Sequence, residues 1–341
     1  MGRLVVPLMI ACVLGHVLTN DDHASHARMR RDIGDTAFVV RAPDLVAENI
    51  AFDSRDGSFL IGSLHQRRIY RVNPRDGSVR PFAGPAPEFG AVLGMKLDLR
   101  SNTLWANTAY SREAPSGQRG RTGSALLEID ASSGVVRAVH APPDTSRTHL
   151  FNDLVVGDGG EVYLTDSEAD AVYVKRQGRD TLALLARGPD DVFGYPNGIA
   201  FSPDGRTLLV AHAGGIMVID PRTGNMRTLE THPDSILGAI DGLYVNGSTL
   251  MGVQATRRGE QIVAARLRMR GALPPGVECV RPLVRGHAAF EQPTTGVVVG
   301  DTLFYIANSQ VRRLDRFDRL AASTKGQSTV ILRVLIPHDC P

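Results

Sequence analysis

The sequence is poor in cysteine and aromatic residues, carries almost no net charge and has only one long apolar run. Its 341 residues include three cysteines and one tryptophan, and 38 basic residues nearly balance 36 acidic ones. A net charge of +2, spread along the chain, gives no reason to expect a nucleic-acid partner. An aromatic content of 6% disfavours a docking surface built on an aromatic cluster. The absence of a Gly-x-Ser-x-Gly motif disfavours a serine esterase.

The one apolar run lies at the N-terminus and is typical of an export signal. It covers Leu4–Leu18 behind Arg3, and small residues suited to cleavage follow it. The run is short for a membrane span, although an uncleaved anchor is the alternative. We therefore expect a signal peptide over residues 1–27 and a flexible polar lead-in over residues 28–34. The mature protein would be secreted or periplasmic, with no stable membrane span.

Removal of the signal would leave two cysteines, Cys279 and Cys340. A single cysteine pair in an exported protein favours a disulfide, which here would tie the C-terminal tail to the last part of the body. Two free thiols are the alternative. An Asn-x-Ser sequon at Asn246 would accept a glycan only in a eukaryotic host.

Four short segments repeat one pattern: an oxygen-bearing side chain, a small or polar neighbour, and an apolar strand followed by a tight turn. They begin 104, 45 and 44 residues apart, so one equivalent unit fits between the first and the second. A repeat of this length, built from short strands, is typical of a β-propeller. The four segments begin at Glu48, Asn152, Asn197 and Asp241.

The chain after the lead-in divides into six such units. Asp-Gly or Asn-Gly pairs between apolar runs, such as Asp56-Gly57, predict hairpins. In the fifth unit, the outer strands are predicted at Gln261–Leu267 and Cys279–Val284. The sixth unit lacks a fourth strand, which a lone strand at Thr36–Arg41 can supply, closing the ring. We predict an all-β, six-bladed β-propeller of four-stranded antiparallel blades over residues 35–341, and expect a monomer.

The first position of the repeat is unusual because it holds only carboxylates and amides. Taken singly, a dipeptide such as Asn197-Gly198 or Asp241-Gly242 could be an ordinary turn sequence. The hairpin turns, however, already have their own Asp-Gly or Asn-Gly. The second and sixth units have Leu93-Gly94 and Thr294-Thr295 instead, so the fold does not require a polar residue there. A ring brings the four side chains together around one axis. Two carboxylates and two amide oxygens suit a hard divalent ion, with Ca²⁺ preferred over Mg²⁺ or Mn²⁺ and Zn²⁺ least favoured.

At these residues the chain resembles the senescence marker protein/gluconolactonase family of six-bladed propellers, which includes regucalcin; paraoxonases and diisopropylfluorophosphatase are more distant. The family hydrolyses lactones, and some members hydrolyse aryl esters or organophosphates. The resemblance implies that Glu48, Asn152, Asn197 and Asp241 hold a catalytic divalent ion and that Asp241 is also the general base. It rests on Ala47-Glu48-Asn49, Phe151-Asn152-Asp153, Tyr195-Pro196-Asn197-Gly198, Ser202-Pro203-Asp204-Gly205 and Ile240-Asp241-Gly242.

The chain departs from the family pattern at one informative place. Members that act on sugar lactones carry a basic residue just before the asparagine of the third blade, whereas this chain has His149-Leu150-Phe151. A less polar lactone or ester is therefore the better candidate for the small-molecule substrate. Propellers similar to strictosidine synthase share the blade pattern but lack the four oxygen-bearing residues, which disfavours that alternative.

We therefore predict a metal-dependent hydrolase of lactones or related esters. The alternative is a non-catalytic propeller that contains Ca²⁺ and binds a small ligand or a protein. Several other side chains are candidates for the pocket or for support of the ligands, the two carboxylates among them also as alternative bases. Each histidine among them could equally be a structural or surface residue. These candidates are Asp153, Asp166, His149, His212, His65 and Thr295.

Overall fold

The computed structural model describes residues 34–110, 123–188, 193–231, 237–270, 273–314, 320 and 326–339. The predicted signal peptide at 1–27, and the lead-in at 28–34 except for its last residue, lie outside these ranges. The described residues form strands joined by turns, together with one short 3-10 helix, η2 (Val311–Arg313). No helix in these ranges is long and apolar enough to cross a membrane.

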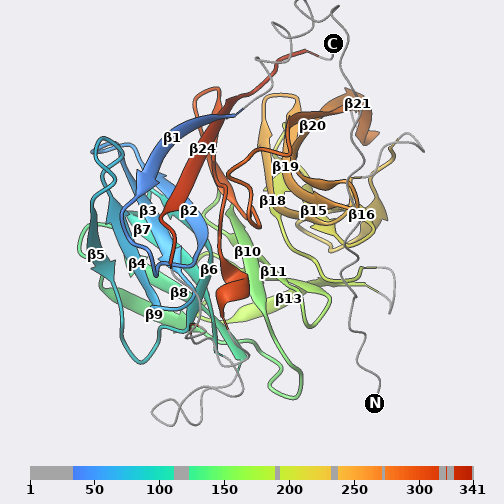
Figure 1. The fold of residues 1–341 in the computed structure, drawn as a ribbon. Helices are drawn as coiled ribbons and strands as arrows, with labels where there is room; N and C mark the ends of the chain where they lie inside the picture. The colour runs from blue at the N-terminus through green and yellow to red at the C-terminus, as the bar shows by residue number, and fades with distance from the viewer. Residues whose placement is uncertain are drawn as a thin grey trace, which may run out of the picture. The chain divides into compact units, whose positions relative to one another are not determined.

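The strands form six antiparallel four-stranded sheets, and each sheet is one blade of a β-propeller (Figure 1). Blade 1 contains β2 (Ala47–Asp53), β3 (Ser58–Ser63), β4 (Arg68–Val72) and β5 (Val79–Ala83), and blade 2 contains β6 (Ala91–Asp98), β7 (Thr103–Tyr110), β8 (Gly123–Asp130) and β9 (Val136–His140). Blade 3 contains β10 (Phe151–Val156), β11 (Val162–Asp166), β12 (Ala171–Lys175) and β13 (Leu182–Arg187), and blade 4 contains β14 (Ile199–Phe201), β15 (Leu208–His212), β16 (Gly215–Ile219) and β17 (Met226–Thr228). Blade 5 contains β18 (Ile240–Asn246), β19 (Thr249–Thr256), β20 (Gly259–Arg270) and β21 (Leu273–Arg285), and blade 6 contains β22 (Gly296–Val299), β23 (Thr302–Ile306), β24 (Thr329–Leu335) and β1 (Asp35–Val40).

The two ends of the chain close the ring, as the sequence predicts. Strand β1 pairs antiparallel with β24, with Val40 opposite Thr329, and becomes the outer strand of blade 6. In Figure 1 the blue β1 runs beside the red β24. The pairing covers the edge that β24 would otherwise expose, which removes a site for aggregation.

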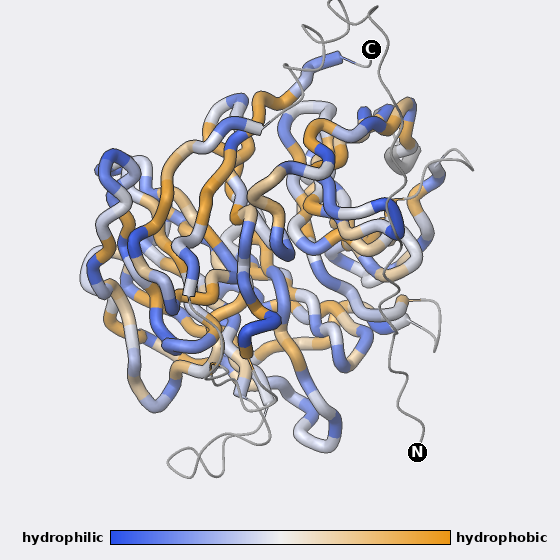
Figure 2. Tube along the Cα trace, in the orientation of Figure 1, coloured by the Kyte–Doolittle hydropathy of each residue, from blue (hydrophilic) through white to orange (hydrophobic). Residues whose placement is uncertain are grey.

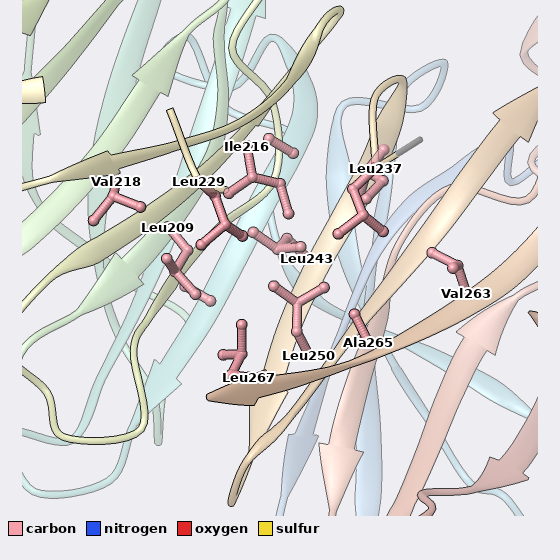
Figure 3. Close-up of a cluster of buried hydrophobic side chains, with 13 residues drawn as sticks. Leu209, Ile216, Val218, Leu229, Leu237, Leu243, Leu250, Val263, Ala265 and Leu267 are labelled. Carbon is pink, nitrogen blue, oxygen red and sulfur yellow. The ribbon is translucent and has the colours of Figure 1, made fainter. Parts of the chain in front are cut away.

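Hydrophobic side chains of neighbouring blades pack against one another and fix each blade beside the next. In Figure 2 hydrophobic segments largely follow the strands, and hydrophilic segments gather at the turns. One cluster joins blades 4 and 5, where Leu209 and Ile216 meet Leu243 and Leu250 (Figure 3). All four of these side chains are almost completely buried. The core is thus spread around the ring, and the first strand of every blade lies next to the axis.

The outer hairpin of blade 5 is longer than predicted. The sequence predicts strands at Gln261–Leu267 and Cys279–Val284, whereas β20 and β21 extend beyond both. Pro274 and Pro275 disfavour a strand in sequence terms, but β21 is an outer strand, where a residue without an N–H group is tolerated. Cys279 in β21 is disulfide-bonded. Its predicted partner, Cys340, lies outside the described residues, so the pairing stays a prediction.

Candidate functional site

One cavity of about 410 Å³ lies at the axis, and the equivalent residue of every blade lines it. In each blade this residue lies within two residues of the start of the first strand, so the six converge on one end of the axis. The four predicted oxygen-bearing side chains are therefore brought together. The six axial residues are Glu48, Leu93, Asn152, Asn197, Asp241 and Thr294.

Most of the axial residues lie on irregularities of the first strand. The pairing of the first strand with the second shifts register at this position in blades 1, 2, 3 and 5. A β-bulge takes a residue out of the regular ladder and changes the direction of its side chain. The bulges therefore allow the axial side chains to point towards the axis. The shifts lie between Ala47 and Asn49, Val92 and Met95, Phe151 and Leu154, and Ile240 and Leu243.

Strained backbone precedes the axial residue in four blades. A non-glycine residue two positions earlier has a positive φ of 44° to 56°. A left-handed conformation of this kind costs about 1–3 kcal/mol and persists only where the surroundings enforce it. For the β-branched Val46 it is a genuine outlier. The chain enters the site through these strained positions, which are Val46, Tyr195, Ala239 and Gln292.

Hydrogen bonds between blades hold the backbone of the axial residues. The hydroxyl groups of Thr294 and Thr295 both donate to the carbonyl oxygen of Glu48, at 3.1 and 2.7 Å. The amide of Asn107 donates to the carbonyl oxygen of Asn152 at 3.2 Å. The hydroxyl of Thr165 donates to the carbonyl oxygen of Asn197 at 2.8 Å. Three of the four ligand candidates are thus held by a side chain of the preceding blade.

The amide groups of the site are oriented so that oxygen is left unpaired. The amide nitrogen of Asn152 donates to the Ser167 hydroxyl at 3.0 Å, and that hydroxyl donates to the carbonyl of Pro196 at 2.7 Å. Asn197 hydrogen-bonds to the Asp241 carboxylate, whereas its own Oδ1 is buried and has no hydrogen-bond partner. A buried acceptor without a donor is costly. A cation or a polar ligand bound at the axis would supply the missing partner.

Three carboxyl groups crowd together at the axis. Burial, and next the charge of Asp153, raise the pKa of Asp241 to about 7, against the lowering effect of the Asn197 hydrogen bond. Burial and the charge of Asp241 raise the pKa of Glu48 well above its usual range. Burial likewise raises the pKa of Asp153, and the positive charge of Lys96 acts against it. In the absence of a cation the fold therefore disfavours the ionised form of all three carboxyl groups.

These observations fit a hard divalent ion. The described residues contain no group of three Asp, Glu, His or Cys side chains placed to hold a metal ion. A metal site at the axis must therefore include the amides Asn152 and Asn197 beside the carboxylates Glu48 and Asp241. Such an all-oxygen set is the kind that Ca²⁺ prefers. The unpaired Oδ1 of Asn197 and the mutual repulsion of the acids are both relieved by a cation.

Asp153 and Thr295 lie behind the cavity wall rather than on it. Asp153 is 1% exposed, and its carboxylate accepts the backbone N–H of Leu154 at 2.8 Å. In blade 6, Thr294 lines the cavity, and the hydroxyl of Thr295 donates to the carbonyl oxygen of Glu48.

The predicted histidines and Asp166 do not line the cavity. His149 and Asp166 are both buried, with Nδ1 and Oδ2 2.5 Å apart, and Nε2 of His149 contacts the carbonyl oxygen of Asp144. Both ring nitrogens are thus used to hold a loop. His212 is buried against Phe193, and burial lowers its pKa. His65, although close to Leu64, is not one of the lining residues.

The wall of the cavity has an apolar side and a polar side. Leu64, Leu93, Leu150 and Val311 form part of one apolar cluster. Leu150 belongs to the His149-Leu150-Phe151 segment just before Asn152. The polar lining residues come from strands β19 and β20, from the helix η2 and from two loops, and most of them could not be predicted because their place at the cavity depends on how distant blades pack. These residues are Tyr195, Gln254, Glu260, Gln292 and Arg312.

Replacing Ser167 by alanine should weaken metal binding about tenfold, as is typical when a hydrogen bond that orients a ligand is lost. Without the hydroxyl, the Asn152 amide is free to rotate away from the axis. Calorimetric titration with Ca²⁺ checks this. Ser202→Ala is the matched control, because Ser202 is also buried and its hydroxyl bonds only Asp204 and Thr207, in the turn after β14. Equal Ca²⁺ affinity of the Ser167 variant and the wild type would refute the orienting role.

Residues 46–249 match the SMP-30/gluconolactonase/LRE-like region family. The chain belongs to this family. The match covers more than half of the sequence and includes Glu48, Asn152, Asn197 and Asp241. A comparison with curated proteins gave no match.

Solved structures similar to this SMP-30/gluconolactonase family member share its fold. A gluconolactonase from Xanthomonas campestris is 19% identical, with a TM-score of 0.54 over 89% of this chain and 88% of that one. The calcium-binding protein regucalcin from Agrobacterium tumefaciens is 15% identical, with a TM-score of 0.54 over 89% and 95%. A virginiamycin B lyase from Staphylococcus aureus is 13% identical, with a TM-score of 0.56 over 87% and 83%. At these identities the likeness concerns the fold alone.

Proposed function

We propose that this protein is a metal-dependent hydrolase of lactones or related esters. The observation that carries the proposal is the convergence of Glu48, Asn152, Asn197 and Asp241 on one cavity, with an unpaired buried amide oxygen among them. Membership of the gluconolactonase family and the likeness to a calcium-binding regucalcin support a lactone substrate and Ca²⁺. Mg²⁺, Mn²⁺ or Zn²⁺ are the alternative ions. We also propose export of a monomer after signal cleavage.

The proposed mechanism assigns separate tasks to the residues of the cavity. A divalent ion held by the four oxygen donors would act as a Lewis acid towards the carbonyl oxygen of the ester. Asp241 would accept the proton of the attacking water on its carboxylate. Asp153 lies buried behind this group and keeps the local potential negative. Ser167 and Ser309 hold Asn152 and Glu48 in place.

The cavity walls favour a substrate less polar than a sugar lactone. Leu64, Leu93 and Leu150 offer apolar surface to an alkyl or aryl group next to the ester. The phenol of Tyr195, which is half-exposed, also lines the cavity. Burial and nearby acids raise its pKa to about 12, so it stays protonated and can donate a hydrogen bond. We therefore propose an aliphatic lactone or an aryl ester as the substrate class.

A substrate panel with and without metal tests the proposed function. We expect an aliphatic lactone or an aryl ester to be hydrolysed with a higher kcat/KM than gluconolactone or a phosphotriester. Treatment with a chelator should lower the activity at least about a hundredfold, and Ca²⁺ should restore it. An activity that is unchanged by the chelator would exclude the metal mechanism. A protein that binds Ca²⁺ but turns over none of these compounds would be a binding protein instead.

A further inference from the structure

A lysine from blade 2 crosses the axis beneath the carboxylates. Lys96 lies on β6, and its Nζ stands 5.4 Å from the centre of the Tyr244 ring on β18. Blades 2 and 5 are opposite each other in a ring of six, so a contact between their inner strands passes through the axis. The Lys96 side chain therefore reaches into the interior of the ring.

The groups around this lysine are acidic. Lys96 interacts electrostatically with Asp153. Asp153 and Asp241 interact in the same way with the Tyr244 hydroxyl, and also with Glu48. The Tyr244 hydroxyl accepts the backbone N–H of Gly296, which fixes the ring that faces the ammonium group. No salt bridge of Lys96 with a described residue is present within 4.0 Å. The lysine thus acts on the cluster through its charge and not through a contact pair.

The charges of this region lead to a simple balance. Fully ionised, Glu48, Asp153 and Asp241 carry three negative charges, and Lys96 supplies one positive charge. At the mouth of the cavity, one acid and one base, Glu260 and Arg312, offset each other. Two negative charges remain, which is the charge that one divalent ion neutralises.

We infer that Lys96 is a built-in counter-charge that matches the axial site to one divalent ion and limits how tightly the site binds it. This inference rests on the metal site of the proposed function. Removing the ammonium group would leave three uncompensated carboxylates, which attract any cation more strongly. The site would then also shift its preference from divalent towards trivalent ions.

Calorimetric titration with Ca²⁺ and with Tb³⁺, on the wild type and Lys96→Met, tests the inference. We expect one Ca²⁺ per wild-type chain, and binding about tenfold tighter by Lys96→Met, with a larger gain for Tb³⁺. Lys175→Met is the matched control, because Lys175 Nζ also lies 5.4 Å from the centre of an aromatic ring, that of Trp105. Lys175 is on the third strand of blade 3, away from the axis. Its loss should change the Ca²⁺ affinity less than twofold.

The outcomes separate the counter-charge from the metal site itself. A wild type that binds no ion would overturn the proposed metal site and this inference with it. If the wild type binds one Ca²⁺ and Lys96→Met binds it equally well, only the counter-charge role is wrong. Lys96→Gln gives the same comparison if Lys96→Met does not fold. Lys96→Arg keeps the charge and should bind Ca²⁺ like the wild type; an affinity gain as large as that of Lys96→Met would point to packing and overturn the inference.

Discussion

Replacing Asp241 by asparagine should lower kcat/KM for the best ester or lactone about a thousandfold. The variant keeps the size of the side chain but loses the charge that binds the ion and the group that accepts the proton. Loss of a general base alone costs a factor of about 10² to 10⁴ in rate. A thousandfold loss is about 4 kcal/mol of transition-state stabilisation. Initial rates at saturating Ca²⁺ measure it, so that weaker metal binding does not hide the effect on chemistry.

Asp220→Asn is the control for this substitution. Asp220 lies in the turn after β16, where its carboxylate accepts the backbone N–H groups of Arg222 and Thr223. An asparagine side chain can accept the same bonds, so rate and Ca²⁺ affinity should stay as in the wild type. If the Asp241 variant retained its activity within a factor of ten, Asp241 could not be the base.

The blade architecture could be predicted because it depends on local signals. Asp56-Gly57 and the other hairpin turns separate short apolar strands at regular intervals, and Gly57 has the positive φ of 74° that the turn needs. The lone strand near residue 36 had only one unpaired edge to join. The gathering of the four oxygen-bearing residues follows from the ring itself, since equivalent positions of a closed repeat share one end of the axis.

The finer structure of the site could not be predicted because it depends on contacts between distant blades. The left-handed conformations of Val46 and Ala239 contradict the preference of those residues, and only the surrounding fold enforces them. In the sequence Lys96 is an ordinary polar residue of a strand, and only the position of blade 5 shows its contact with Tyr244. The sequence allows a pocket role for His149, but its Nδ1 is paired with the carboxylate of Asp166, 17 residues further on. Arg312 reaches the cavity wall from the short helix η2, which the sequence did not predict.

The metal-free protein should become less stable as the pH rises, in contrast to the Ca²⁺-loaded protein. Asp241 has a pKa of about 7 in the folded protein, against an ordinary value of 3.8 that applies to the unfolded chain. At a pH between these two values, the folded chain holds a proton that the unfolded chain has released. Raising the pH through this window therefore favours unfolding. The contribution of protonated Asp241 to the free energy of unfolding is fully present below pH 3.8 and lost above about pH 7. Glu48 and Asp153, whose pKa values are also raised, act in the same direction.

Urea denaturation of demetallated protein at pH 5 and pH 8 measures this effect. We expect the free energy of unfolding to fall by about 2–3 kcal/mol over this range from Asp241 alone, at about 1.4 kcal/mol per pKa unit. Saturating Ca²⁺ should remove the loss, because the ion binds the ionised carboxylates, so its stabilising effect grows with pH. Asp241→Asn should lose the corresponding part of the pH dependence. Equal stability of the metal-free wild type at both pH values would show that the three carboxyl groups are not crowded in the way the fold places them.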